Sequence, residues 1–147
     1  ARKDAKQQPA FAIYHIPIKQ QIEAWGQKKA AGVKLNGGGS AEKEDGSTLG
    51  LLKDLGVRAG FCGHIHTFDY TAQCEDVELV FGHATGWAGW GGDVVPKGAK
   101  LITLNAQSGT HTWESIFADG SRWQPTPGKQ VDQLVDNPWK DKVEKKA

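Results

Sequence analysis

The chain has 147 residues, 38% hydrophobic and 24% charged, which is the composition of one folded domain and excludes a wholly disordered chain. Its 18 basic and 17 acidic residues leave a net charge of +1, too small for the basic surface that binds a nucleic-acid backbone. No apolar run approaches the roughly 20 residues that cross a bilayer, and no charged-then-apolar leader begins the chain. We therefore expect neither a nucleic-acid nor a membrane partner.

The first third of the chain is predicted to hold a strand, a helix and a loop. Residues 1–10 are polar and basic and form a lead-in. The apolar run 11–15 predicts a buried strand that ends at His15. Apolar residues at about a helical period predict one amphipathic helix over 18–31. The polar, glycine-rich segment 36–47 predicts an exposed loop, because its glycine run lacks the Lys-Ser/Thr pair of a phosphate-binding loop.

A second helix and strand follow this loop. Leucines three residues apart predict a short helix over 48–55, capped by Ser47 and ended by Gly56. The apolar segment 57–62 predicts a buried strand that runs directly into Gly-His-Ile-His at 63–66. In α/β folds, functional sites gather at the carboxyl ends of such strands.

The rest of the chain is predicted to be β-structure followed by a tail. Three strands without intervening helices are expected, at 77–81, 100–104 and 112–117, and we interpret them as an antiparallel flank. Residues 124–147 contain three prolines and a charged end, and predict an extended tail packed at most through Leu134 and Trp139.

Several side chains have roles that the sequence leaves open. Cys62 and Cys74 form either one disulfide or two buried thiols. Trp87 and Trp90, in the run T-G-W-A-G-W-G-G, line a substrate cleft or cover an edge of the core. His111 lies in a polar turn and is expected at the surface.

His64 and His66 form the strongest candidate for chemistry. Two histidines two residues apart at a strand end can direct their rings toward one point, and neutral imidazole is a common metal ligand. Gly63 before them permits a tight turn. A histidine pair alone more often has a structural or surface role, so its neighbours in the sequence decide how it is interpreted.

Four sequence blocks in order resemble the calcineurin-like metallophosphoesterases, in their purple acid phosphatase-like variant. The block F-C-G-H-I-H-T-F-D-Y resembles the family's G-H-x-H block, and A-I-Y-H-I-P resembles its strand that ends in a metal-binding histidine. The run F-G-H-A-T-G-W-A-G-W-G resembles its glycine-rich block, and G-A-K-L-I-T-L resembles the strand after that. The four blocks span residues 11–104.

The resemblance implies an α/β fold that is the C-terminal half of a metallophosphoesterase-type αββα sandwich, ending in antiparallel strands, with the partial domain at 11–123. It implies hydrolysis of a phosphate monoester or diester with two divalent or mixed-valence transition metals, Fe, Zn or Mn. His15 and His64 match the histidines that bind the second metal, and His66 matches one that binds the first.

The departures from the family pattern are as informative as the matches. The family's aspartates, asparagine and remaining histidines lie N-terminal to the matching region, and their motifs do not occur in this sequence. We therefore expect a missing N-terminal half or a partner chain to supply those ligands, and expect no efficient hydrolysis by this chain alone. Its catalytic residue stays unknown. The alternative is a degenerate, non-catalytic half-domain that acts as a structural or assembly subunit.

Two polar residues beside the candidate ligands are further candidates. Asp69 either orients His66 through a hydrogen bond or caps the next turn. His83 stands where the family has arginine, which leaves a contact with phosphate or with a metal ligand open. Ile65 and Phe68 replace the aspartate and asparagine frequent in the purple acid phosphatase-like variant.

Overall fold

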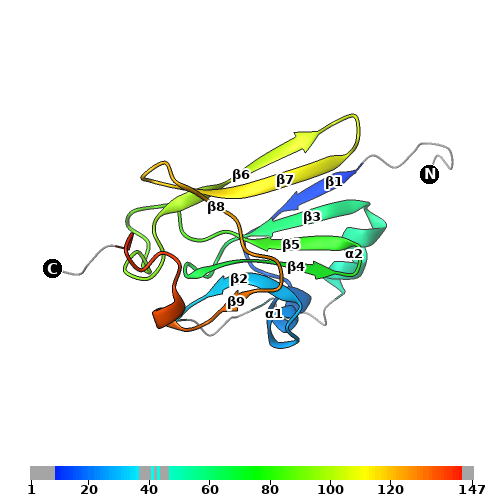
Figure 1. Cartoon of the computed structure of the whole chain (residues 1–147). Coiled ribbons are helices and arrows are strands. Elements are labelled where there is room, and N and C mark those ends of the chain that lie inside the picture. Colours follow the sequence, from blue (N-terminus) through cyan, green and yellow to red (C-terminus); the bar gives the residue numbers. More distant parts are fainter. Residues whose placement is uncertain (1–8, 37–40, 42, 44–46, 144–147) are drawn as a thin grey trace.

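The computed structural model describes residues 9–36, 41, 43 and 47–143 (Figure 1). Its helices are α1 (Lys19–Gly26), α2 (Thr48–Asp54) and the short 3-10 helix η1 (Leu134–Asp136). Its strands are β1 (Ala10–Ile13), β2 (Ala30–Lys34), β3 (Val57–Cys62), β4 (Phe68–Cys74), β5 (Val77–Phe81), β6 (Gly98–Asn105), β7 (Thr110–Phe117), β8 (Arg122–Trp123) and β9 (Gln130–Val131). In the described part of the chain, neither α-helix has the length and apolarity needed to span a membrane.

The strands form two sheets that make two of three layers. The larger sheet has the order β1-β3-β5-β4-β2-β9, and β4 runs antiparallel to both of its neighbours while the other adjacent strands are parallel. The smaller sheet, β6-β7-β8, is antiparallel. Helices α1 and α2 cover one face of the larger sheet and the smaller sheet covers the other (Figure 1). The expected α/β architecture that ends in antiparallel strands is confirmed.

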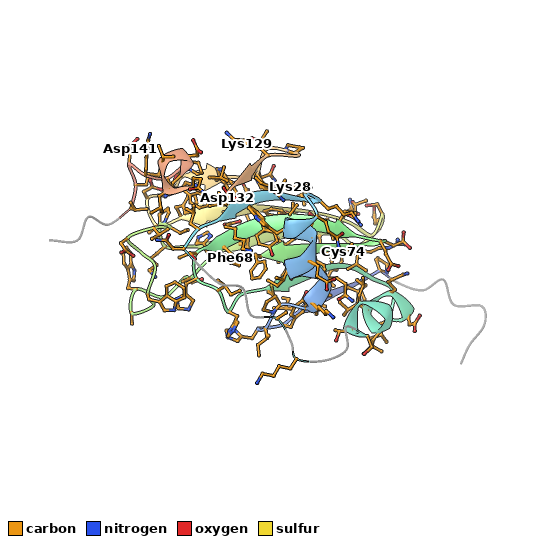
Figure 2. All side chains as sticks on the ribbon, turned by 90° about the horizontal axis from the view of Figure 1, so that it is seen from below. Lys28, Phe68, Cys74, Lys129, Asp132 and Asp141 are labelled. Atoms are coloured by element: carbon orange, nitrogen blue, oxygen red, sulfur yellow. The ribbon has the colours of Figure 1, made fainter. Side chains whose placement is uncertain are left out.

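Both faces of the larger sheet are buried, one against the helices and the other against the smaller sheet. Successive side chains of each strand point alternately to these two faces. On β4, Phe68, Tyr70 and Ala72 pack toward the helices, in a core that includes Trp25 of α1. Figure 2 shows Phe68 and Cys74 at opposite ends of β4. Asp69 lies between Phe68 and Tyr70 and points to the other face of the sheet, so it lies at the interface of the two sheets.

The expected helix over 18–31 is wrong in its second half. Helix α1 ends at Gly26, the chain turns at Lys28 with φ 60°, and residues 30–34 enter the larger sheet as β2. Gly32 permits this, because a Cβ there would lie 2.4 Å from the carbonyl oxygen of Asp69 on the neighbouring strand. The predicted loop at 36–47 lies mostly outside the described residues.

The remaining predicted elements match more closely. Strand β3 has the predicted bounds, and α2 ends one residue before its prediction, with Gly56 at φ 73°. The predicted cap is wrong, because the side chain of Ser47 makes no capping hydrogen bond. Residues 77–81 do form a strand, but it pairs in parallel with β3 inside the larger sheet and does not belong to the antiparallel flank.

The two cysteines are free, buried thiols, so the disulfide alternative is wrong. Cys62 pairs with Phe81 at one end of β5, and Cys74 pairs with Val77 at the other. The two cysteines therefore lie at opposite ends of β5 and on opposite sides of it, too far apart for a disulfide. Burial raises the pKa of both thiols.

The C-terminal segment is part of the fold. Strand β9 adds to the edge of β2, and Trp139 packs against Phe117 and Trp123 in a second buried cluster. Of the two predicted anchors, Trp139 is confirmed at 2% exposure, whereas Leu134 is 51% exposed.

We predict that Trp139→Ala lowers the free energy of unfolding by about 3–5 kcal/mol, the usual cost of removing a buried tryptophan. The matched change Leu134→Ala should alter it by less than about 0.5 kcal/mol, because that side chain is exposed. Urea denaturation followed by tryptophan fluorescence and circular dichroism measures both. Equal stability of the two variants would mean that the C-terminal segment does not pack as described.

Candidate functional site

His15 and His64 lie side by side at the carboxyl ends of two adjacent parallel strands. The pairing of β1 with β3 continues past both strands, since Tyr14 N donates to Phe61 O at 3.0 Å and Gly63 N donates to His15 O at 3.2 Å. His15 Nε2 consequently lies 3.3 Å from His64 Nδ1, and the two rings meet edge to face. The predicted proximity of these two candidate ligands is thus seen in the geometry.

The backbone at His64 adopts an uncommon conformation. Its φ is 73°, in the left-handed region that side chains with a Cβ seldom adopt. The turn is tight, because Ile65 N donates to Gly63 O at 2.9 Å. A strained histidine in a loop between buried strands is the kind of outlier that accompanies functional sites.

His66 is engaged elsewhere. Its Nδ1 lies 3.0 Å from the carbonyl oxygen of Trp90, and its ring stacks on the indole at 4.7 Å with an interplanar angle of 20°. Across residues 9–36, 41, 43 and 47–143, no three His, Cys, Asp or Glu side chains are grouped so that they could hold a metal ion. The structure therefore pairs His15 with His64, and the convergence of all three histidines stays a prediction.

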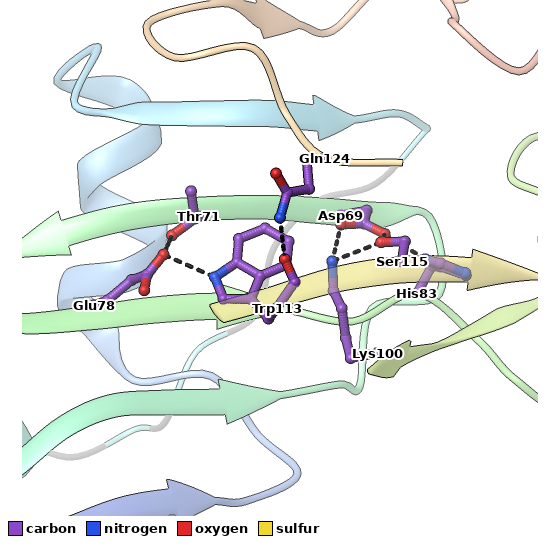
Figure 3. Close-up of polar contacts among 8 residues, drawn as sticks. All are labelled: Asp69, Thr71, Glu78, His83, Lys100, Trp113, Ser115 and Gln124. Atoms are coloured by element: carbon purple, nitrogen blue, oxygen red, sulfur yellow. Dashed lines mark hydrogen bonds and ion pairs between the residues drawn. The ribbon is translucent and has the colours of Figure 1, made fainter. Parts of the chain in front are cut away.

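Asp69 is fully buried and connects the two sheets (Figure 3). Its carboxylate accepts hydrogen bonds from His83 Nδ1 at 2.5 Å and Ser115 Oγ at 2.8 Å, and it forms an ion pair with Lys100. Lys100 Nζ also donates to Ser115 Oγ at 2.8 Å. In place of the expected contact with His66, or a turn cap, Asp69 sits within β4 and binds side chains from β6 and β7.

The charge on Asp69 is stabilised by these partners. Burial alone would raise the pKa of this carboxyl, but the Lys100 ammonium and the hydrogen bond from His83 outweigh it and lower the pKa. Burial lowers the pKa of Lys100, against the opposing pull of Asp69. The pair is a buried ion pair, and His83 and Ser115 donate the further hydrogen bonds to its carboxylate.

His83, whose contact with phosphate or with a metal ligand the sequence left open, faces the interior. Its ring stacks on Phe117 at 5.2 Å, and Nδ1 binds Asp69. Its Nε2 is buried and, within the described residues, has no hydrogen-bond partner. His83 thus acts as a packing residue that also donates to a buried carboxylate.

A second carboxylate connects the same two sheets, and the sequence did not indicate it. Glu78 on β5 accepts from His111 Nε2 at 2.7 Å, Trp113 Nε1 at 2.9 Å and Thr71 Oγ1 at 2.7 Å (Figure 3 shows the last two). The expectation of a surface role for His111 is therefore wrong. The signal was the two-residue alternation along β7, whose inward positions are His111, Trp113, Ser115 and Phe117.

The tryptophans differ from each other. Trp90 covers His66, which is neither of the two roles left open for it. Trp87 is 70% exposed and borders a cavity of about 370 Å³ that Leu101, Ile116 and Phe117 also line. Trp87 therefore matches the cleft alternative more closely than the core-edge one.

We predict that Asp69→Asn lowers the free energy of unfolding by about 3–5 kcal/mol, because it leaves Lys100 buried without a counter-charge. Since the folded pKa of Asp69 lies below the unfolded value of about 3.9, its contribution is complete above that pH and is lost as the pH falls toward the folded pKa. The stability difference between the wild type and the variant should thus shrink below about pH 4. Asp119→Asn, which removes an exposed ion pair with Lys142, is the control and should change little. A variant as stable as the wild type at neutral pH would contradict this account of the buried pair.

His64 gives a second prediction. His64→Gly should be more stable than His64→Ala by about 1 kcal/mol, because both remove the imidazole and only glycine adopts φ 73° without strain. Thermal or urea unfolding of the two variants measures the difference. Equal stability would show that the left-handed conformation at this position is absent in solution.

Comparison with known proteins identifies relatives of the chain. It is 28% identical over 108 residues to probable inactive purple acid phosphatase 28 of Arabidopsis thaliana, which covers 74% of this chain and 27% of that protein. It is 29% identical over 87 residues to probable inactive purple acid phosphatase 29 of the same plant, 56% of this chain and 22% of that protein.

The matched region is a small part of each relative. The chain spans about a quarter of the length of the curated relatives it matches. No protein-family profile matches it, and neither does any solved structure. The four sequence blocks, the layered α/β architecture and these two relatives together make the chain a relative of the purple acid phosphatase-like proteins.

Proposed function

We propose that the chain forms part of a purple acid phosphatase-like site, in which His15 and His64 bind one transition-metal ion and other ligands come from another polypeptide segment. The observation that carries the proposal is the 3.3 Å separation of His15 Nε2 and His64 Nδ1. Two nitrogens bound to one zinc-like ion at about 2.0–2.1 Å, with a tetrahedral angle between them, lie about 3.4 Å apart. The separation of the two nitrogens therefore matches that of two imidazole ligands of one ion.

The same pair is insufficient for hydrolysis on its own, although water can complete the coordination of a single bound ion. Two neutral imidazoles leave at least two positions of a tetrahedral ion unfilled, and they carry no negative charge to offset a divalent cation. His66 would serve a second ion, as the family resemblance implies. Two such ions about 3.5–4 Å apart clamp a phosphoryl group for in-line displacement, which makes phosphate esters the proposed substrate class. Iron, zinc and manganese are the candidate metals.

The open edges of both sheets support a partner segment. Among the residues that the structure describes, β1 has no strand partner on one side, and neither has β6 in the smaller sheet. The two strands lie close to each other, since Phe11 of β1 and Ile102 of β6 pack on the same buried cluster. Exposed apolar side chains occur on both, including Ile13 at 81% exposure and Leu104 at 54%. We propose that the segment carrying the remaining ligands extends both sheets at this side, because unpaired strand edges with apolar neighbours favour pairing.

The second candidate is a non-catalytic half-domain. Two observations favour it. Both relatives are named as probable inactive purple acid phosphatases, and the Nδ1 atom of His66 is in contact with the carbonyl oxygen of Trp90. In that case the paired histidines bind a single ion, or none, and the sheet edges serve assembly. The two candidates agree on the partner and differ in whether that partner brings acidic ligands to His64.

We predict that the isolated chain shows no appreciable turnover of p-nitrophenyl phosphate in added Mn²⁺, Zn²⁺ or Fe²⁺, because the site lacks most of its ligands. An N-terminal segment that carries the remaining ligands of the family, joined to the chain or mixed with it, should restore metal-dependent turnover that His64→Ala abolishes. Turnover by the isolated chain that His64→Ala removes would show a self-sufficient enzyme and overturn the proposal. Absence of turnover in the joined protein, with metal bound, would favour the non-catalytic candidate.

A further inference from the structure

The loop at residues 85–92, here called the tryptophan loop, lies directly on residues 63–67, here called the histidine loop. A Cβ at Gly89 would lie 3.2 Å from His66 Cε1, and one at Gly91 would lie 2.9 Å from Thr67 Cγ2. Gly91 also has φ 92°, a conformation that glycine adopts without strain. These two glycines therefore allow an approach to His66 that residues with side chains would block.

A buried lysine holds this loop in place. Lys97 is 4% exposed, and its Nζ donates to the carbonyl oxygen of Gly89 at 2.6 Å and lies 3.4 Å from that of Trp90. A buried ammonium needs such acceptors, because desolvation without them is unfavourable. The carbonyl that meets His66 thus belongs to a loop that is held by Lys97, at the end of the same connection between β5 and β6.

The contact between His66 and this carbonyl has a chemical consequence. A carbonyl oxygen only accepts hydrogen bonds, so the 3.0 Å contact requires that His66 Nδ1 carry the proton. In the neutral ring, Nε2 is then the nitrogen with the free lone pair. Stacking on Trp90 restricts rotation of the ring about its side-chain bonds.

We infer that Trp90 and Lys97 are positioning residues, which hold His66 as the Nδ1–H tautomer so that Nε2 is the nitrogen offered to a ligand. This inference rests on the proposed function only in naming a metal ion as that ligand. Histidines that bind metals commonly donate their other ring N–H to a backbone carbonyl or a carboxylate, which selects the tautomer and the ring orientation. The loop supplies that group before any ion is bound.

The test is the tautomer of His66 in the metal-free chain. Long-range ¹H–¹⁵N correlation spectra of the ¹⁵N-labelled protein at about pH 8.5, well above the ordinary histidine pKa of about 6.5, distinguish protonated from unprotonated ring nitrogens. We expect about a tenfold excess of the Nδ1–H form, the bias that one hydrogen bond of ordinary strength gives. His111 is the internal control with the opposite result, because its Nε2 donates to Glu78. A dominant Nε2–H form at His66, or an even mixture, would overturn the inference.

Variants identify the residues responsible. Lys97→Met should reduce the excess at His66 to roughly threefold or less, since the loop carbonyls lose their anchor. Trp90→Leu keeps the carbonyl and removes the stacking, and should reduce the excess less. Trp87→Leu changes the same loop at an exposed position and should leave the tautomer unchanged. An unchanged tautomer in both Lys97→Met and Trp90→Leu would show that neither residue positions His66.

This result is separable from the proposed function. The spectra are recorded without metal or substrate, so the wild-type tautomer tests the inference even if a variant fails to fold. If the tautomer is as expected but the chain, with the N-terminal segment joined to it, binds no metal, the proposed function fails and the positioning of His66 stands.

Discussion

The arrangement of both sheets depends on a carboxylate with no access to water. Asp69 sits in β4 of the larger sheet, and its partners Lys100 and Ser115 belong to the smaller one. An ionised carboxylate in such a place is strongly destabilising unless its oxygens are fully satisfied. The two sheets are therefore restricted to the relative position in which these partners reach it. Glu78 imposes a similar restriction farther along the interface.

This buried carboxylate also determines where the candidate ligands lie. The histidine loop spans only the short distance between the end of β3 and the start of β4, and Asp69 is the second residue of β4. His83, which follows β5, is bound to the same carboxylate. The loops after β3 and β5 are thereby held close together, and Ala84 N donates to His66 O at 3.3 Å between them. A rigid scaffold thus supports a site that, within the described residues, has only two adjacent imidazoles.

Local patterns predicted the elements with strong local signals and missed those that depend on distant partners. Strands β3 and β5 had short, largely apolar runs between turns, and their bounds were correct. The first two residues of β2, Ala30 and Ala31, were assigned to a helix, and alanine has no strong strand preference. Only the place of β2 between β4 and β9 makes it a strand. Tertiary pairing outweighed local preference there.

The candidate site shows the same division. The pairing of His15 with His64 followed from two strand ends and the order of the sequence blocks. The partners of Asp69 could not be predicted, because Lys100 and Ser115 lie more than 30 residues away and look like ordinary surface residues in sequence. The engagement of His66 by Trp90 depends on a backbone carbonyl, which no side-chain pattern reveals.

The central claim is that His15 and His64 share one metal ion, and a crystal of the chain soaked in dilute Zn²⁺ tests it most directly. Anomalous diffraction at the zinc edge should show one strong peak within about 2.0–2.2 Å of both His15 Nε2 and His64 Nδ1. No peak at that position, or a peak at His111 or His66 alone, would contradict the claim.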